Sequence, residues 1–447
     1  MVPGTISGPE GFFEFGPQIV CYGHSNSGVS AQVNDSHLFD ASASVRHSGS
    51  DIHLPFDPCE VIENLWYERY ARKLPSEPKR LLDHPLIRQA YYFGRGALPV
   101  SVRRHLQRAY LNDWQQISFP DWPIDFTVDT LHEEILRKCM QAANVEKVPF
   151  IWFWPGGAPN CLLMTHDVET AVGRDFSSTL MGIDDSYGFK AAFQVIPEKR
   201  YEVTEDYIAS IRGRGFEFNV HDLNHDGCLF KEREEFLRRA KKINAYVHKY
   251  QARGFRAGAM YRNQDWFDAF EFSYDMSVPN AARLESQRGG CCTVMPYFIG
   301  EILELPLTTC QDYSLLHILS DYSLELWKQQ LRLLSQRNGL MTFIVHPDYM
   351  IERRARRLFE SLLDYLRQMV DRDRIWAPLP GDLDRWWRAR RNMELVPDGN
   401  TWKIEGPQSE RARLAYAVID GSGRLIYRLE DVAANACNPG PQGPPAS

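Results

Sequence analysis

The sequence predicts an α/β protein built around a parallel sheet or barrel, with smaller additions at both ends. Between about 149 and 380, short apolar runs alternate with amphipathic stretches of helical period, the pattern of parallel strands joined by helices. The chain has 447 residues, which favours one large domain plus additions over a single compact core. The composition, 44% hydrophobic and 24% charged, is that of a globular protein.

Composition and charge exclude several classes of function. The net charge is −7, from 51 basic and 58 acidic residues, which argues against nucleic acid or an anionic membrane as the main partner. The most apolar window, VPFIWFWPGGAPNCLLM, is interrupted by prolines and glycines and does not predict a membrane span. The first residues lack a secretory signal, and the nine cysteines form no CxxC pair. We therefore expect a cytoplasmic protein without a disulfide framework.

The chain divides into regions of different character. Short alternating pieces at the start predict two or three strands, and Pro-marked helical stretches follow, the last over about 128–144. After the α/β block, the runs ARLAYAVID and GRLIYRLE flank a Gly-Ser-Gly turn and predict a hairpin. The expected regions are a β-rich lead-in 1–58, a mostly helical extension 59–148, the barrel 149–393, a small β extension 394–430 and a disordered tail 431–447.

Within the α/β block, each element has its own local signal. TEDYIASIRGRG begins with a Thr cap and ends at a glycine, and three longer stretches carry an apolar stripe: EEFLRRAKKINAYVHKY, SLELWKQQLRLLSQRNG and RRLFESLLDYLRQMV. The apolar runs predict buried strands. They are PFIWFW, CLLMTH, KAAFQVI, FEFNVH, GFRAGAM, FSYDMSV, EILELPL, LMTFIVH and IWAPLP.

Four of these runs end in polar residues that are unusual after a buried strand. Because the carboxyl ends of parallel strands meet at one face, these residues are expected to converge there. Taken singly, each has an ordinary explanation, such as a helix cap, a surface pair or a turn histidine. Their joint order at successive strand ends favours an active site. The residues are His166, Asp167, Glu169, His221, His225, Arg256, Tyr261, Arg262 and His346.

The pair His221 and His225 indicates a metal site. A spacing of four puts two side chains on one face of a helical turn, ~5–6 Å apart. One carboxylate from the first strand end would complete three protein ligands and leave an open position, as in catalytic zinc sites. Along an extended strand, Asp167 and Glu169 share a side and His166 lies opposite. One carboxylate would bind the metal and the other act as general base, and the spacing does not decide which.

These residues lie in four motifs, LMTHDVE, HDLNH, FRAGAMYRN and FIVHP. Their order resembles the polysaccharide deacetylase superfamily, the nodulation-factor deacetylase homology domain of carbohydrate esterase family four, with LMTHDVE as a variant His-Asp-Val-Glu form of the first motif. They occur in the family's order over roughly residues 150–380, about half of the chain.

This resemblance implies a distorted (β/α) barrel of about seven strands and removal of N- or O-acetyl groups from a saccharide or sugar conjugate. It implies one divalent metal, usually Zn²⁺, held by His221, His225 and a carboxylate, with His346 as the acid and Arg256 tuning the base. We expect Asp167 as base and Glu169 as metal ligand, with Asp167 as ligand the alternative.

The sequence departs from the family pattern in several places. Asp167-Val168-Glu169 replaces an adjacent Asp-Asp, and the third motif has Gly258 and Ala259 without its usual proline. Asp275 is the candidate partner of Arg256. QRGGCC at 287–292 matches no motif and is expected to be an exposed loop, with a substrate contact by Arg288 as the alternative.

Three other functions share parts of this pattern. A zinc protease is disfavoured because Asp222 rather than Glu follows the first histidine, and Asn224 and Gly227 suit a loop. Another C–N hydrolase acting on a small amide such as a ureide would use the same barrel. A catalytically degenerate glycan-binding protein would use aromatic residues such as Trp152, Trp154, Tyr261 and Trp266.

Overall fold

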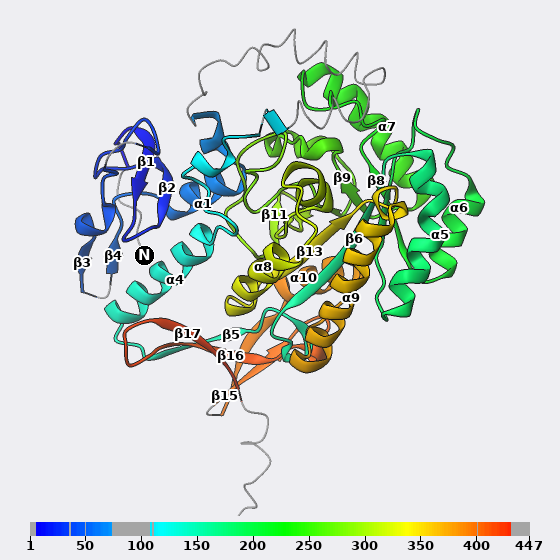
Figure 1. Cartoon of the computed structure of the whole chain (residues 1–447). Coiled ribbons are helices and arrows are strands. Elements are labelled where there is room, and N and C mark those ends of the chain that lie inside the picture. Colours follow the sequence, from blue (N-terminus) through cyan, green and yellow to red (C-terminus); the bar gives the residue numbers. More distant parts are fainter. Residues whose placement is uncertain are drawn as a thin grey trace, which may run out of the picture.

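A curled, mostly parallel sheet forms the centre of the molecule (Figure 1). The computed structural model describes residues 6–34, 37–49, 51–73, 108–109, 111–399 and 401–430. The sheet has eight strands in the order β11-β12-β10-β9-β8-β7-β6-β13, seven of them parallel and β11 antiparallel to β12. This confirms the predicted distorted (β/α) barrel. The strands are β6 Cys161–Val168, β7 Ala192–Val195, β8 Glu217–His221, β9 Gly254–Arg256, β10 Tyr274–Asp275, β11 Tyr297–Ile299, β12 Ile302–Glu304 and β13 Leu340–Val345.

Strands β6 and β13 lie side by side and are buried along their whole length. Strands covered on both faces are expected to be continuously apolar, and the runs CLLMTH and LMTFIV have this pattern. The parallel register pairs Val345 with His166, so the residues that come after both strands emerge at the same edge of the sheet.

Helices cover the sheet, and four of them are those that the sequence predicts (Figure 1). Thr204 caps α6 by accepting a hydrogen bond from the Tyr207 N–H, as its position predicts. The first helix of the block, α5, and the last, α10, were not predicted. The helices are α5 Ala171–Ser186, α6 Glu205–Gly213, α7 Arg233–Tyr250, α8 Glu325–Gln336, α9 Arg353–Asp373 and α10 Pro380–Arg391.

The N-terminal region has a hydrophobic core of its own. Two antiparallel hairpins pack with α1 Pro58–Trp66 and α4 Thr127–Ala142, giving four strands where two or three were expected. Phe13 and Phe56 lie in this core with Leu131 of α4 and with Cys292 from the barrel block. Residues 74–107 of the expected helical extension lie outside the described residues. The strands are β1 Glu10–Glu14, β2 Val20–His24, β3 Arg46–Ser48 and β4 Asp51–His53.

The C-terminal region corrects the assignment of two apolar runs. The predicted hairpin forms β16 Leu414–Ile419 and β17 Leu425–Leu429, but β16 also pairs antiparallel with β5 Lys147–Ile151. The run PFIWFW therefore belongs to this small sheet and not to the barrel. The assignment was wrong because apolar content indicates a strand but not the strand with which it pairs. IWAPLP contributes only a bridge between Trp376 and Cys161. A second hairpin, β14 Glu394–Asp398 with β15 Thr401–Glu405, was not predicted, and the expected tail 431–447 lies outside the described residues.

Short helical turns connect the longer elements: η1 Ala41–Ser44, η2 Arg69–Lys73, η4 Trp114–Gln116, η5 Pro155–Gly157, η6 Gly258–Met260, η7 Gln264–Ala269, η8 Ser314–Ile318, η9 Tyr349–Ile351 and η10 Ser409–Arg411. Over the described part of the chain, none of the helices is both long and apolar enough to cross a membrane. The eight cysteines within it are free thiols.

Candidate metal and acid–base site

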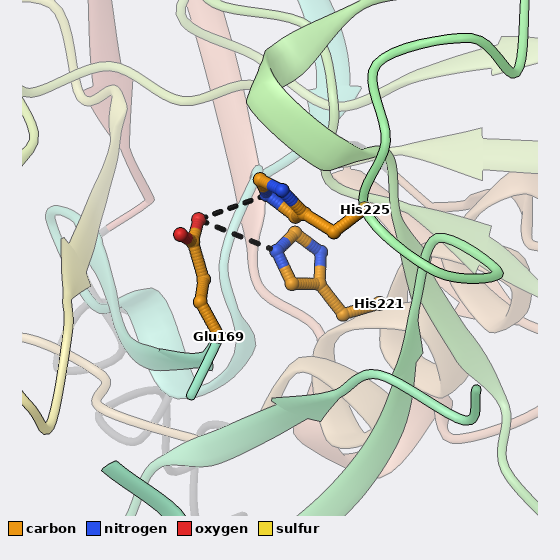
Figure 2. Close-up of side chains that lie close together, drawn as sticks. All are labelled: Glu169, His221 and His225. Carbon is orange, nitrogen blue, oxygen red and sulfur yellow. Dashed lines mark ion pairs between the residues drawn. The ribbon is translucent and has the colours of Figure 1, made fainter. Parts of the chain in front are cut away.

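Three of the predicted site residues form a cluster at the carboxyl ends of β6 and β8 (Figure 2). Glu169 comes directly after β6, His221 ends β8, and His225 lies in the loop after it. One ligand atom from each side chain lies within 4.8 Å of the other two. Glu169 Oε1 is 2.9 Å from His225 Nε2 and 3.9 Å from His221 Nε2.

The two histidines converge by a route that the sequence did not predict. No helical turn joins them: His221 is in a strand, and Asp222 and His225 both adopt left-handed backbone conformations, with φ of 54° and 55°. The expected helical placement is therefore wrong, although the side chains do meet. Gly258 explains how the loop fits, since a Cβ there would lie 2.9 Å from the His225 ring and 2.5 Å from Asp222 Oδ2.

The Nε2 atoms of both histidines face Glu169. His221 Nδ1 donates to the Arg256 carbonyl oxygen at 3.0 Å, which places the lone pair on Nε2. Nε2 of His221 and of His225 are both buried, and neither makes a hydrogen bond with a described residue. Two imidazole nitrogens beside a carboxylate oxygen form a donor set that fits a zinc-like divalent ion.

Asp167 lies between this cluster and Arg256. Its Oδ1 accepts a hydrogen bond from Arg256 Nη1 at 2.6 Å, and its Oδ2 is 3.8 Å from His221 Nε2. Burial alone would raise the pKa of Asp167, but Arg256, His221 and His346 together outweigh it and lower that pKa below its usual value. Asp167 is therefore an ionised carboxylate at the edge of the cluster.

Arg256 is fully buried and held from several sides. Besides Asp167, its Nη1 donates to Thr165 Oγ1 at 2.9 Å, and its Nε donates to the Met276 carbonyl oxygen at 2.9 Å. The expected pairing with Asp275 needs correction, because the direct ion pair of Arg256 is with Asp167. The Asp275 carboxylate accepts hydrogen bonds from Ser277, and its charge interacts with that of Arg256 without a direct ion pair.

His346 comes directly after β13 and faces Glu169 from the other side, with its Nε2 3.5 Å from Glu169 Oε1. Its Nδ1 donates to Asp312 Oδ1 at 2.6 Å, and its backbone N–H donates to Asp312 Oδ2 at 2.7 Å. Burial alone would lower the pKa of His346, but Asp312 and Glu169 raise it well above its usual value. Asp312 was not singled out from the sequence. The available signal was a carboxylate shortly after the apolar run EILELPL.

His166 points away from the cluster, as the alternation of the strand predicts. Its Nε2 contacts Asp184 at 2.9 Å and its Nδ1 contacts the Val345 carbonyl oxygen at 3.1 Å. The ring also packs against Phe193 and Phe359. His166 therefore holds β6, β13 and α5 together on the outer face of the sheet.

The segment QRGGCC is not the exposed loop that was expected. Cys291 and Cys292 are fully buried, and Tyr70 of the N-terminal region donates a hydrogen bond to the Gly290 carbonyl oxygen. Arg288 forms an ion pair with Asp113 at 2.6 Å. Its second half is covered by residues from the N-terminal half of the chain, a long-range contact without a local sequence signal, whereas Gln287 and Arg288 line a cavity.

Arg262 and Tyr261, predicted near the site, line a neighbouring cavity of about 600 Å³. Arg262 is fully buried and forms a two-pronged ion pair with Glu68, whose carboxylate also accepts from Gln264 at 2.9 Å. The cavity begins at Gly227, two residues after His225. Its other lining side chains are mostly aromatic or hydrogen-bonding, and among them are Tyr67, Phe230, Asn263 and Gln287.

Comparisons with known proteins give similarities of structure only. No family model and no curated protein matches the chain. A polysaccharide deacetylase structure from Mycobacterium smegmatis is 18% identical, with a TM-score of 0.43, over 54% of this chain and 94% of its own. A family 4 acetyl xylan esterase from Clostridium thermocellum with a cobalt ion is 15% identical, with a TM-score of 0.33, over 51% and 91%. An allantoinase is 10% identical, with a TM-score of 0.41, over 53% and 92%.

Proposed function

We propose that this protein is a metal-dependent hydrolase that removes acetyl groups from an N-acetylated saccharide or sugar conjugate. The observation that carries this proposal is the cluster of Glu169, His221 and His225, with Asp167 on one side of it and His346 on the other. Metal-assisted hydrolysis of an amide needs three protein ligands that leave one coordination position for water or substrate. It also needs a carboxylate as base and an oriented histidine as acid.

Glu169, His221 and His225 would hold the ion, which we expect to be zinc. When bound, such an ion polarises the acyl carbonyl and acidifies water. Burial would raise the pKa of Glu169, but His225, then His221 and His346, lower it well below its usual value, so this ligand is ionised. His221 is held in the ligating tautomer by its hydrogen bond to the Arg256 carbonyl oxygen.

Asp167 is proposed as the general base. It makes no close contact with His225 and is fixed by Arg256, which supports the assignment of Glu169 rather than Asp167 as the metal ligand. An ionised carboxylate next to the cluster accepts the proton of the attacking water, and Arg256 fixes the direction from which it does so.

His346 is proposed as the general acid. Asp312 and Glu169 raise its pKa despite its burial, which favours the protonated imidazole, and its Nδ1–H is already used by Asp312. The proton on Nε2 is therefore the one available to the departing nitrogen of the substrate.

The neighbouring cavity supports a saccharide as the substrate. Aromatic side chains of Tyr67, Phe230 and Tyr261 offer faces for the C–H side of a sugar ring. Amide side chains of Asn263 and Gln287 offer donors and acceptors for hydroxyl groups. Gly227 of its lining is two residues after His225, and we propose on this basis that the sugar ring binds next to the reacting amide. The cytoplasm is the proposed setting.

Metal analysis together with product analysis tests this function. Purified protein is expected to contain about one equivalent of a divalent metal and to release acetate from N-acetylated mono- and disaccharides. Protein without metal that releases no acetate would overturn the proposal. Hydrolysis of a small ureide with no acetate release would instead identify another C–N hydrolase.

A further inference from the structure

Two buried carboxylates lie side by side behind Arg256. Asp275 ends β10 and Glu304 ends β12, and the two residues are direct partners in the parallel register. Neighbouring strands are ~4.8 Å apart, so side chains at paired positions project from the same face of the sheet and touch. Both residues are completely buried.

The hydrogen bonds of this pair leave one oxygen without a donor. Ser277 donates to both Asp275 oxygens, through its hydroxyl at 2.7 Å and its N–H at 2.9 Å. Glu304 Oε1 accepts from the Val278 N–H at 3.0 Å. Glu304 Oε2 is buried and accepts no hydrogen bond from any described residue.

An ionised Glu304 would therefore bury a charged oxygen without a donor, next to a second carboxylate. Both conditions are costly in a protein interior. A proton on Glu304 Oε2 removes both costs, because the hydroxyl then donates to the adjacent Asp275. Burial raises the pKa of Glu304 well above its usual value, and the charge of Asp275 raises it further.

The pair is connected to Arg256 by a short chain of contacts. The Ser277 hydroxyl, which donates to Asp275, accepts a hydrogen bond from the Ala257 N–H at 2.8 Å. The Met276 carbonyl oxygen accepts from Arg256 Nε at 2.9 Å. Residues 275–277 therefore hold both the guanidinium of Arg256 and the backbone after it. Arg256 in turn contacts Asp167.

We propose that Asp275 and Glu304 share one proton and that the resulting single negative charge makes them positioning residues for Arg256 and, through it, for Asp167. The pair then carries one negative charge. The buried guanidinium of Arg256 therefore interacts with two anions, Asp167 and the Asp275–Glu304 pair. The proposal of a shared proton does not depend on the function of the protein, whereas the proposed effect on turnover rests on the proposed function.

Substitution of Glu304 by Gln is the central test. Gln is neutral and of the same size, and it offers an oxygen to the Val278 N–H and an N–H to Asp275. We expect Glu304→Gln to keep kcat/KM within about threefold of the parent, with unchanged metal content. The double variant Asp275→Asn with Glu304→Gln removes the charge whichever residue carries it, and its kcat should fall roughly 10- to 100-fold with KM unchanged. Equal loss in both variants, or no loss in the double variant, would overturn the proposal.

Two further measurements keep the test independent of folding and of the substrate. Ser277→Ala removes only the hydroxyl that links Asp275 to the backbone after Arg256, and it should lower kcat while leaving KM and metal content unchanged. The infrared spectrum of the parent protein at pH 8 should contain the carbonyl stretch of a protonated carboxylic acid. The spectrum of Glu304→Gln at the same pH should lack this band. Persistence of that band in Glu304→Gln would overturn the shared proton, even for a protein with no deacetylase activity.

Discussion

The candidate site has a ligand side and an acid–base side, and they differ in how many of their polar atoms form hydrogen bonds within the protein. On the ligand side, the Nε2 atoms of His221 and His225 face Glu169 and make no hydrogen bond within the described part of the chain. On the acid–base side, His346 is held by Asp312 through both its ring and its backbone, and Asp167 is held by Arg256. The first side offers its nitrogen and oxygen atoms to the proposed ion, whereas the second is held by hydrogen bonds within the protein.

This difference separates affinity for the metal from turnover. Substitutions on the ligand side should remove the metal and therefore all activity. Substitutions on the acid–base side should leave the metal in place and change only the rate or its pH dependence. Four substitutions test that separation, in order of decreasing effect.

His221→Ala should have the largest effect. Loss of one of three ligands is expected to weaken metal binding by more than ~100-fold and to remove turnover, since partners of the ligands alone contribute 10- to 100-fold. Metal content after dialysis and calorimetric titration with zinc measure the effect. His248→Ala is the matched control, because His248 is exposed and pairs with Glu271 away from the cluster. If His221→Ala binds zinc like the control, the ligand assignment is wrong.

His346→Ala should retain the metal but lose turnover. Removal of a general acid typically lowers kcat by roughly 10²- to 10⁴-fold. Steady-state kinetics and metal analysis on the same preparation measure the two properties separately. Full activity of this variant would exclude His346 as the acid, and loss of metal would remove the distinction between the two sides.

Asp312→Asn should change the pH dependence of turnover. The charge of Asp312 raises the pKa of His346, and the acid is active below that pKa, so activity falls as the pH rises through it. Without the charge this pKa decreases, and the alkaline fall in kcat/KM should move to lower pH. The rate should also fall roughly 10- to 100-fold. A pH profile that does not move would show that Asp312 has no influence on the acid.

Asp184→Asn should affect stability and leave the site intact. It weakens a buried pair with His166 on the outer face of the sheet, which should lower the free energy of unfolding by about 1–3 kcal/mol. Denaturant unfolding measures this change, and metal content should not differ from the parent. The control is Asp185→Asn, because Asp185 is a partly exposed neighbour whose ion pairs contribute about 0–1 kcal/mol. Loss of metal in Asp184→Asn would show that His166 also supports the ligand side.

The sequence predicted the barrel and the residues that meet at its mouth because both depend on local patterns. A buried strand is a continuous apolar run, and the residues that come after parallel strands emerge on one face. In this way Asp167, Glu169, His221, His225 and His346 could be grouped, and the structure brings them together. Their individual roles remain predictions.

The features that the sequence did not predict depend on partners that are distant in the chain or on backbone conformation. Asp312 contacts His346 across 34 residues, and no spacing rule connects the two. The left-handed conformation of His225 cannot be inferred from its distance to His221. The apolar run that contains part of β5 predicts a strand, but it does not indicate that this strand pairs with β16, more than 260 residues later.

The ion pair between Glu68 and Arg262 affects where the chain can be cut into fragments that fold independently. The sequence suggests a boundary near residue 148, ahead of the barrel block. A fragment that begins there would retain Arg262, completely buried in the whole chain, without the carboxylate that balances its charge. Loss of one partner from a buried pair typically destabilises a protein by about 3–5 kcal/mol. The smallest unit that folds on its own is therefore expected to include Glu68, so a stable fragment for expression has to keep part of the lead-in with the barrel.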